Sequence, residues 1–326
     1  KINLSKDASE IMNIVLLTNA ESPQKNITNE EFLKFKSDWL IRNSDLELIE
    51  EYLLKNQVFN LHPQLTKHLV NQYLSEANIK KSCEIFSKIQ DALTDEYLSK
   101  FSIYCLVYSG KEEEAQLIFD LKKELGFNEE YFERKMNFFF GYNTKVDLAI
   151  SEKTIFDFYL AHQSNPDFYF EPNNKTSKMI WKYLSSSGLL KSAESIDISK
   201  LDEVSTLEKA THNKNYPEKE LFKIYKRFQF NINQLLNAEQ AYKPLTNIEG
   251  RALLYQKILL ESEIIRKLNY LKLLKKSFKD NDLENAFDNE LKKFLEEIDP
   301  MEIPDNLTSF YYTNIEIKDD DKIERK

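Results

Sequence analysis

Glycine and proline are scarce in this chain, with 5 glycines and 8 prolines among its 326 residues. Sheets joined by tight turns need more of both residues, so the shortage favours a mostly helical fold. No apolar run approaches the roughly 20 residues that a membrane-spanning helix requires. We therefore expect a soluble, predominantly helical protein without a membrane span.

The chain also lacks a net positive charge: its formal net charge is −9 and its isoelectric point is about 5.3. Nucleic-acid binding draws its affinity from clustered lysine and arginine, so this balance argues against a general polyanion binder. The sequence begins at Lys1 without a basic and apolar leader. This start is compatible with a cytoplasmic protein and with one exported, for example to a periplasm, after a leader has been removed.

Cysteine is nearly absent. The two cysteines, Cys83 and Cys105, each lie in an apolar helical context, in the segments 82–86 and 103–107. Free cysteine is among the most buried residue types, so we expect two thiols that fill a core, with a disulfide as the alternative. The sequence therefore leaves the redox compartment undefined.

Sequence motifs of the common enzyme classes are missing as well. The four histidines lie far apart, without the His-Glu-x-x-His pattern, and the cysteines lack Cys-x-x-Cys spacing, so a zinc site is unsupported. The glycines are isolated from one another, so there is neither a phosphate-binding loop nor a dinucleotide fingerprint. We predict no metal site, no cofactor and no catalytic residues, and hence a protein that is not an enzyme.

A repeat of about 33 residues is present in the first part of the chain. Three copies align, and each contains two runs of apolar residues at helical spacing, separated by a small residue at Ser44, Ala77 or Gly110. In the first helix the equivalent positions are Phe32, Leu65 and Leu98; Phe35, His68 and Phe101; Leu40, Tyr73 and Leu106; and Ile41, Leu74 and Val107. In the second helix they are Ile49, Ser82 and Ala115; Tyr52, Ile85 and Ile118; and Leu53, Phe86 and Phe119. Each copy is thus predicted to be a helical hairpin.

The third copy resembles a known repeat family. The segment 108–119 places the small Ala115 early in the second helix and the aromatic Phe119 four residues later, as tetratricopeptide-like repeats do. The usual tryptophan, first-helix glycine and closing proline of that family are missing from this copy. The resemblance covers residues 28–126 and implies a right-handed superhelix with a concave peptide-binding face.

Later parts of the chain show helical patterns without a regular period. We predict tetratricopeptide-like repeats over 1–142, irregular helical hairpins that continue the array over 143–298, and an extended, partly disordered tail over 299–326. One of the amphipathic segments is 218–236, and two prolines interrupt the start of the tail. The complete prediction is an all-α fold, an α-solenoid of stacked antiparallel helical hairpins.

The segment 163–176 is the best candidate for a hinge or a structured loop, because it contains two prolines and several asparagines. Its aromatic centre, Phe168, Tyr169 and Phe170, is too apolar for a disordered linker. We expect this centre to dock against a helix, and we include its three residues among the candidate partner-binding residues.

A basic and aromatic stretch over 209–230 supplies the other candidate partner-binding residues, which are Lys214, Lys223, Lys226 and Arg227. Basic and aromatic side chains together hold RNA or an acidic peptide in many proteins. However, Phe222, Tyr225 and Phe228 recur at helical spacing, and this pattern is more typical of a core-facing helix with its lysines in water.

These observations lead to a non-enzymatic scaffold or adaptor that binds a protein or peptide partner as the first hypothesis. A second hypothesis is an accessory helical region of a cell-wall or polysaccharide-processing enzyme, because the chain also resembles the non-catalytic superhelix of soluble lytic transglycosylases. It carries the Glu-Ser dipeptide of their catalytic part at Glu21, Glu194 and Glu261, without the glycine-rich motif that should follow. A third hypothesis is an RNA-binding solenoid that uses residues 209–230.

Overall fold

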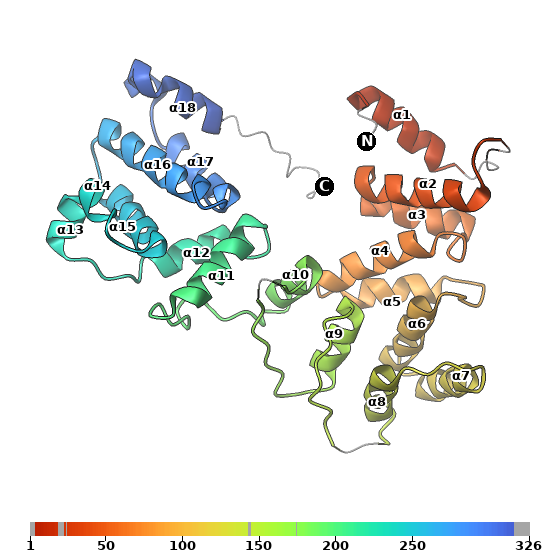
Figure 1. Ribbon diagram of the computed structural model, residues 1–326. Coiled ribbons are helices and arrows are strands. Elements are labelled where there is room, and N and C mark those ends of the chain that lie inside the picture. Colours follow the sequence, from red (N-terminus) through yellow and green to blue (C-terminus); the bar gives the residue numbers. More distant parts are fainter. Residues whose placement is uncertain (1–3, 19–22, 24, 143–144, 174, 316–326) are drawn as a thin grey trace. The chain divides into compact units, whose positions relative to one another are not determined.

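Regular structure in this protein is helical. The computed structural model describes residues 4–18, 23, 25–142, 145–173 and 175–315, and these residues form α-helices and short 3-10 helices but no β-strand (Figure 1). The prediction of an all-α fold is confirmed. The chain divides into two compact units, called unit 1 (Lys1–Tyr169) and unit 2 (Phe170–Lys326). The division falls within the segment 163–176, whereas residue 142 marks the end of the regular sequence repeat.

The helices of unit 1 are coloured from red to yellow-green in Figure 1. They are α1 (Lys6–Leu16), α2 (Asn29–Asn43), α3 (Leu46–Asn56), α4 (Pro63–Ser75), α5 (Ile79–Ser87), α6 (Glu96–Tyr108), α7 (Glu112–Glu124), α8 (Glu130–Phe139) and α9 (Ile155–Gln163). In the part of the chain that the structure describes, none of the helices combines the length and the apolar character needed to cross a membrane.

The sequence repeat is visible in the helix boundaries and in the packing. The second helices of the three copies, α3, α5 and α7, begin at Leu46, Ile79 and Glu112, which are 33 residues apart. The first helices contact one another in order, α2 with α4, α4 with α6 and α6 with α8. Two sets of equivalent positions in the second helices are buried in every copy: Ile49, Ser82 and Ala115, and Leu53, Phe86 and Phe119. The repeat therefore encodes the packed face of these hairpins.

Side-chain caps begin several of the repeat helices. Thr28 and Glu31 form a capping box at the start of α2, in which each side chain accepts a backbone N–H group of the other residue. Asn78 and Asp95 begin α5 and α6 by accepting the backbone N–H group three residues further along the chain. Local sequence thus sets where these helices start.

The turns inside the second and third hairpins use left-handed backbone. Ala77 has a φ of 58° and Gly110 a φ of 74°, whereas Ser44 in the first hairpin has a φ of −120°. Left-handed backbone costs an L-residue about 1–2 kcal/mol, a cost that glycine largely avoids. Glycine therefore meets a conformational requirement in the third copy, whereas Ala77 bears the cost of this conformation in the second.

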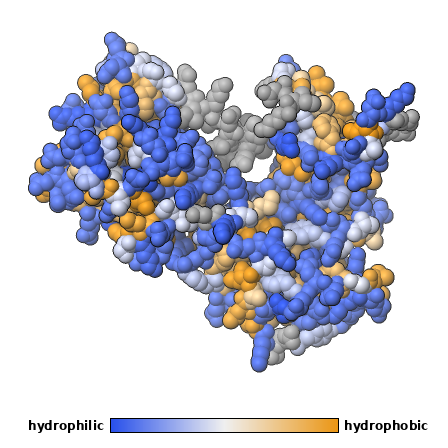
Figure 2. Space-filling model, in the orientation of Figure 1, coloured by the Kyte–Doolittle hydropathy of each residue, from blue (hydrophilic) through white to orange (hydrophobic). Residues whose placement is uncertain are grey.

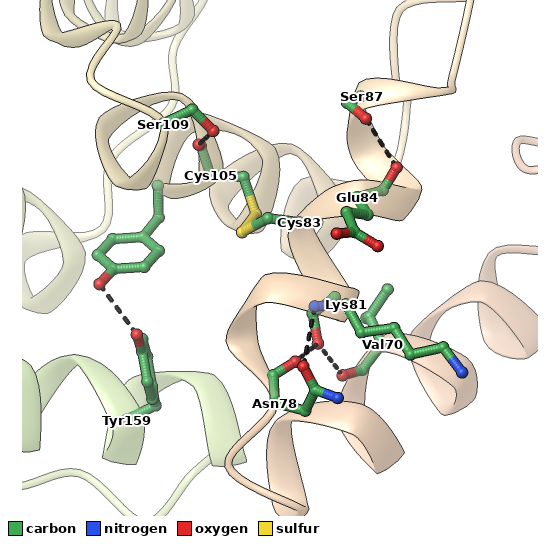
Figure 3. Close-up of a disulfide and its surroundings, with 11 residues drawn as sticks. Val70, Asn78, Lys81, Cys83, Glu84, Ser87, Cys105, Ser109 and Tyr159 are labelled. Carbon is green, nitrogen blue, oxygen red and sulfur yellow. Dashed lines mark hydrogen bonds between the residues drawn. A yellow bond between two sulfur atoms is a disulfide. The ribbon is translucent and has the colours of Figure 1, made fainter.

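A disulfide joins the second hairpin to the third. Cys83 in α5 is bonded to Cys105 in α6, with the Cα atoms 5.2 Å apart and both residues buried (Figure 3). The prediction of two free thiols is therefore wrong. The apolar context of each cysteine correctly indicated burial, but the bond depends on the packing of α5 against α6, which the local context of a cysteine does not reveal.

Aromatic rings fill the core where α9 joins the repeat helices. Phe101 of α6 stacks on Phe156 of α9, with the ring centroids 4.3 Å apart, and Phe86 of α5 stacks on the other side at 5.1 Å. The hydroxyl groups of Tyr104 and Tyr159 lie 3.1 Å apart and share a hydrogen bond (Figure 3). Ring pairs of this kind add to the stability that burial itself provides, so α9 is an integral part of unit 1.

Unit 2 is an irregular helical assembly around one hydrophobic core that extends from Trp181 to Tyr311. Its helices are α10 (Lys178–Ser186), α11 (Leu201–His212), α12 (Glu218–Tyr225), α13 (Ile232–Leu236), α14 (Ala238–Ala241), α15 (Asn247–Leu260), α16 (Ile264–Lys279), η1 (Glu284–Phe287), α17 (Asp288–Glu296), η2 (Pro300–Glu302) and α18 (Asp305–Ile315).

A buried ion pair lies in the core of unit 2. Arg251 of α15 donates two hydrogen bonds to the carboxylate of Glu208 in α11, at 2.5 and 3.0 Å, and both side chains are almost fully buried. The hydroxyl group of Tyr225 in α12 donates to the same carboxylate. Burial, followed by the charge of Glu208, raises the pKa of Tyr225 well above its ordinary value. Three helices are thus joined through one carboxylate.

The structure differs from the predicted extended tail over residues 299–315. Pro300 occupies the first turn of η2 and Pro304 directly precedes α18, positions where a missing backbone N–H group is tolerated. Leu307 and Tyr311 of α18 are buried against the core of unit 2. The remainder of the predicted tail, residues 316–326, lies outside the described residues.

Candidate functional site

The aromatic centre of the loop, residues 168–170, spans the division between the units. The ring of Phe168 lies 5.5 Å from that of Phe158 and 5.1 Å from that of His162, and both of these residues belong to α9. The predicted docking against a helix is therefore confirmed for Phe168. Tyr169 is 63% exposed and Phe170 is half-buried. Partner binding by these three residues stays a prediction.

Lys223 and Arg227 have partners inside unit 2. Lys223 forms an ion pair with Glu220, one turn earlier in α12, at 2.7 Å. The guanidinium group of Arg227 donates to two backbone carbonyl oxygens of the turn at 193–196. Arg227 therefore has a clear structural function, since it holds this turn against the chain that follows α12.

The remaining predicted residues of the stretch separate into a core face and a solvated face. Phe222, Tyr225 and Phe228 are buried in the core of unit 2, which confirms the interpretation of this spacing as a core-facing pattern. Lys214 and Lys226 are exposed. The aromatic and basic residues thus point to different environments and do not form one mixed surface.

The N-terminal part of the same stretch lines an open cleft in unit 2 with a volume of about 540 Å³. The first turn of α10, the last turn of α11 and the turn after α16 supply its walls. The side chains that matter for its chemistry are Lys178, Trp181, Lys209, His212, Asn213 and Asp282. A volume of this size suits a small ligand or a few residues of a peptide.

Local sequence positions these walls. The hydroxyl group of Ser177 accepts the backbone N–H group of Ile180 and begins α10, so that Lys178 lies in the first turn of this helix. Helix α11 ends at His212, and the left-handed backbone of Lys214, with a φ of 61°, changes the direction of the chain after this helix. Asp282, with a φ of 56°, makes the corresponding turn after α16.

Hydrogen-bond donors dominate the cleft. Lys178 and Lys209 are exposed, and neither forms an ion pair with the described residues. Trp181 is 3% exposed, and no acceptor for its indole N–H group is found in the described part of the chain. His212 accepts the backbone N–H group of Asn285 at its Nδ1 atom, at 3.3 Å, so its donor position is Nε2.

Only part of this site is indicated by the sequence. Lys209 and His212 belong to the basic and aromatic stretch, but Lys178, Trp181 and Asp282 come from segments that are distant in the sequence. In the sequence, the only indications of these positions are Ser177, a small capping residue before an amphipathic helix, and the turn residues at 280–282. Folding of unit 2 is what groups them.

A second polar cluster lies buried in unit 1, around His62. The Nδ1 atom of His62 lies 3.0 Å from the hydroxyl group of Ser37, and its Nε2 atom lies 3.0 Å from that of Tyr52. Lys36 sits over the ring of Tyr52 at 4.4 Å. Burial, together with the charge of Lys36, lowers the pKa of His62 to about 4. Burial also lowers the pKa of Lys36 to about 8 and raises that of Tyr52 to about 12.

A serine hydrogen-bonded to a histidine is a nucleophile and base in many hydrolases, but such a pair has to face a substrate. Ser37, Tyr52 and His62 are each less than 5% exposed. The neutral histidine therefore serves as a buried hydrogen-bonded connection among α2, α3 and the N-terminus of α4.

The two Glu-Ser dipeptides in the described residues, at Glu194 and Glu261, lack the raised pKa of a glycosidase acid. Hydrogen bonds to its own backbone N–H group and to Ser192 lower the pKa of the exposed Glu194. A hydrogen bond from Lys257 lowers the pKa of Glu261, whereas a catalytic general acid needs a raised pKa. Glu21 lies outside the described residues.

Comparison with known proteins gives no further guidance: no family model, no curated protein and no solved structure matches the chain. Across the residues that the structure describes, no three metal-ligating side chains of His, Cys, Asp or Glu come together.

Proposed function

We propose that this chain is a non-enzymatic, helical-repeat binding protein that holds a segment of a protein partner in the cleft of unit 2. One observation carries the proposal. The cleft is large enough for several residues of a peptide, and its walls present donors that have no acceptor within the described residues. Such donors gain hydrogen bonds when a ligand with acceptor groups binds.

The hairpins of unit 1 support the binding function as a scaffold. Their equivalent positions are buried alike and their first helices contact one another in order, as expected for an array of tetratricopeptide-like hairpins. We therefore propose an α-solenoid for this unit. Polar residues cover most of the face of the molecule seen in Figure 2, which is typical of a surface that meets water or a polar partner.

The alternative functions have less support. RNA-binding proteins stack bases on exposed aromatic rings, but Phe222, Tyr225 and Phe228 are buried and Trp181 is 3% exposed. A polysaccharide-cleaving function needs a pair of carboxyl groups in a cleft, whereas Asp282 is the single acidic residue among the described ones that lines the cleft of unit 2. Glu208 lies in α11, a helix that lines the cleft, but its carboxylate is buried in the core and accepts hydrogen bonds from Arg251.

The disulfide favours an oxidising compartment for this binding function. Disulfides persist in secreted and periplasmic proteins and are rare in the cytosol of most organisms. Cys83 and Cys105 are both buried, so the bond has a structural function rather than an exchange function. Of the two localisations compatible with the sequence, we therefore propose export.

Site-specific photo-crosslinking in the source cell tests the proposed function. A photoreactive phenylalanine analogue replaces Asn213 in the cleft wall, and the matched control replaces Lys276 on the exposed side of α16 in the same unit. We expect a discrete protein adduct from position 213 and none from position 276. Equal adducts from both positions, or no adduct from either, would contradict the proposal. Hydrolysis of peptidoglycan by the purified chain would favour the cell-wall alternative.

A further inference from the structure

The chemical class of the ligand follows from the imbalance of donors and acceptors in the cleft of unit 2. Two ammonium groups, those of Lys178 and Lys209, are present together with the indole N–H group of Trp181 and the Nε2 position of His212. None of these four donor groups is used by another described residue. A ligand that fits has to present acceptor oxygens.

The hydroxyl groups in the cleft wall do not change this balance, because they are already bonded. The hydroxyl oxygen of Thr176 accepts the backbone N–H group of Asn173, and that of Ser177 accepts the N–H group at the start of α10. The hydroxyl group of Thr206 donates to a backbone carbonyl oxygen one turn earlier in α11, at 3.0 Å. Asp282 is the acidic group of the wall.

The charge of the wall selects among anions. Two lysines and one aspartate leave the cleft with one excess positive charge. A carboxylate carries one negative charge and matches this excess, whereas a phosphate group carries between about 1.5 and 2 negative charges at pH 7 and is repelled by Asp282. Lysine binds as a point charge, and N–H donors beside it supply direction.

We infer that the cleft of unit 2 binds a carboxylate of its ligand between Lys178 and Lys209, with Trp181 and His212 as N–H donors. The inference rests on the proposed function and specifies the partner segment: it contains an aspartate or glutamate side chain, or it ends in a free C-terminal carboxylate. Asp282 lowers the affinity for anions with more than one charge and accepts an N–H group of the ligand.

Binding of defined peptides to the full chain tests this inference by titration calorimetry. The first probe is a hexapeptide with a central glutamate, acetylated at its N-terminus and amidated at its C-terminus. The second replaces the glutamate by glutamine, and the third has no acidic side chain but a free C-terminus. We expect the first or the third peptide to bind at least about tenfold more tightly than the second, and the two arms identify the source of the carboxylate. Inorganic phosphate is expected to compete only weakly.

Variants of the wall separate recognition from a structural effect. Lys178→Gln and Lys209→Gln are each expected to weaken carboxylate binding by up to about fivefold, the effect of one exposed ion pair. Lys272→Gln, on the exposed side of α16, is the matched control and should leave the affinity unchanged. Asp282→Asn should strengthen binding by about two- to fivefold, a gain that damage to the fold would not produce.

Some outcomes would overturn the inference. Equal binding of the glutamate and glutamine peptides, or weaker carboxylate binding by Asp282→Asn, would show that the cleft does not recognise a carboxylate. If photo-crosslinking from position 213 nevertheless yields a protein partner, the proposed function stands without this inference. If the carboxylate peptides bind but no protein adduct forms in the cell, carboxylate recognition by the cleft stands and the proposed protein partner is excluded.

Discussion

Ala77 occupies a backbone conformation that is unfavourable for alanine. Its φ of 58° is left-handed, and the equivalent position of the third hairpin is occupied by Gly110. Left-handed backbone costs alanine about 1–2 kcal/mol, while glycine adds about 0.5–1 kcal/mol of entropy to the unfolded chain. Ala77→Gly is therefore expected to raise the free energy of unfolding of unit 1 by about 0.5–1 kcal/mol in a urea titration.

Gly110→Ala is the matched control for this prediction. The φ of Gly110 is 74°, and no atom lies within 4 Å of the Cβ atom that alanine would add, so the substitution changes the backbone energy without a steric clash. It should lower the free energy of unfolding by about 1 kcal/mol. If both substitutions shift the urea midpoint in the same direction, the explanation from left-handed backbone is incorrect.

Each unit carries one tryptophan, and this makes unit-specific measurements straightforward. Trp39 lies in α2 of unit 1, where its indole N–H group donates to the side chain of Asn13 at 2.7 Å. Trp181 lies in α10 of unit 2. In Trp181→Phe the fluorescence reports on unit 1, and in Trp39→Phe it reports on unit 2.

At the scale of the helices, the disulfide between α5 and α6 contributes to the stability of unit 1. Cys83 and Cys105 are separated by 22 residues, and closing a loop of this length stabilises a fold by about 3 kcal/mol in the chain-entropy model. Reduction with dithiothreitol is therefore expected to lower the urea midpoint that Trp39 fluorescence reports. The double variant Cys83→Ala/Cys105→Ala should show a similarly low midpoint that dithiothreitol does not change. A further shift on reduction of this variant would exclude the disulfide as the cause.

The ion pair between α11 and α15 is the corresponding connection in unit 2. Glu208→Gln leaves the buried Arg251 without its counter-charge and is expected to cost about 3–5 kcal/mol, measured by urea unfolding with Trp181 as the probe. The double variant Glu208→Gln/Arg251→Met removes both charges and should be less destabilised than the sum of the single variants Glu208→Gln and Arg251→Met. Additive single and double effects would mean that the two side chains do not stabilise each other.

Local sequence patterns predict most of the helical segments, but they do not predict all of the helix boundaries. The sequence predicts one amphipathic segment over 218–236, but the structure ends α12 at Tyr225 and starts α13 at Ile232. Asn231 and Gln234 form a capping box there, a signal that is visible in the sequence but weaker than the apolar pattern. The disulfide was missed for a different reason, since it depends on two helices being neighbours.

For the whole molecule, composition and periodicity predict the all-α class, whereas the candidate site depends on contacts between distant segments. Lys209 and His212 lie in the predicted basic stretch, but Lys178 and Asp282 reach the same cleft from α10 and from the turn after α16. No periodic pattern links such positions. The unpaired lysines of the cleft can therefore be recognised only from the folded structure of unit 2.

The stability of the molecule in acid should be limited by unit 1, because His62 is buried in its neutral form. Its pKa is about 4 in the folded chain and 6.5 when unfolded, so the unfolded state binds the proton first as the pH falls. The stabilising effect of the neutral ring is complete above pH 6.5 and is lost progressively down to about pH 4. Burial raises the pKa of Asp157 in the same unit, which opposes this trend.

Comparison with His62→Gln isolates the contribution of the histidine. The free energy of unfolding of unit 1, read from Trp39 fluorescence in urea, should fall by on the order of 2 kcal/mol more in the wild type than in His62→Gln between pH 7 and pH 4.5. His68→Gln is the comparison variant: burial alone lowers the pKa of His68, without the charge of a neighbouring Lys36, so the effect of this substitution should be smaller. Parallel pH profiles of the wild type and His62→Gln would mean that protonation of this buried ring does not limit the acid stability of unit 1.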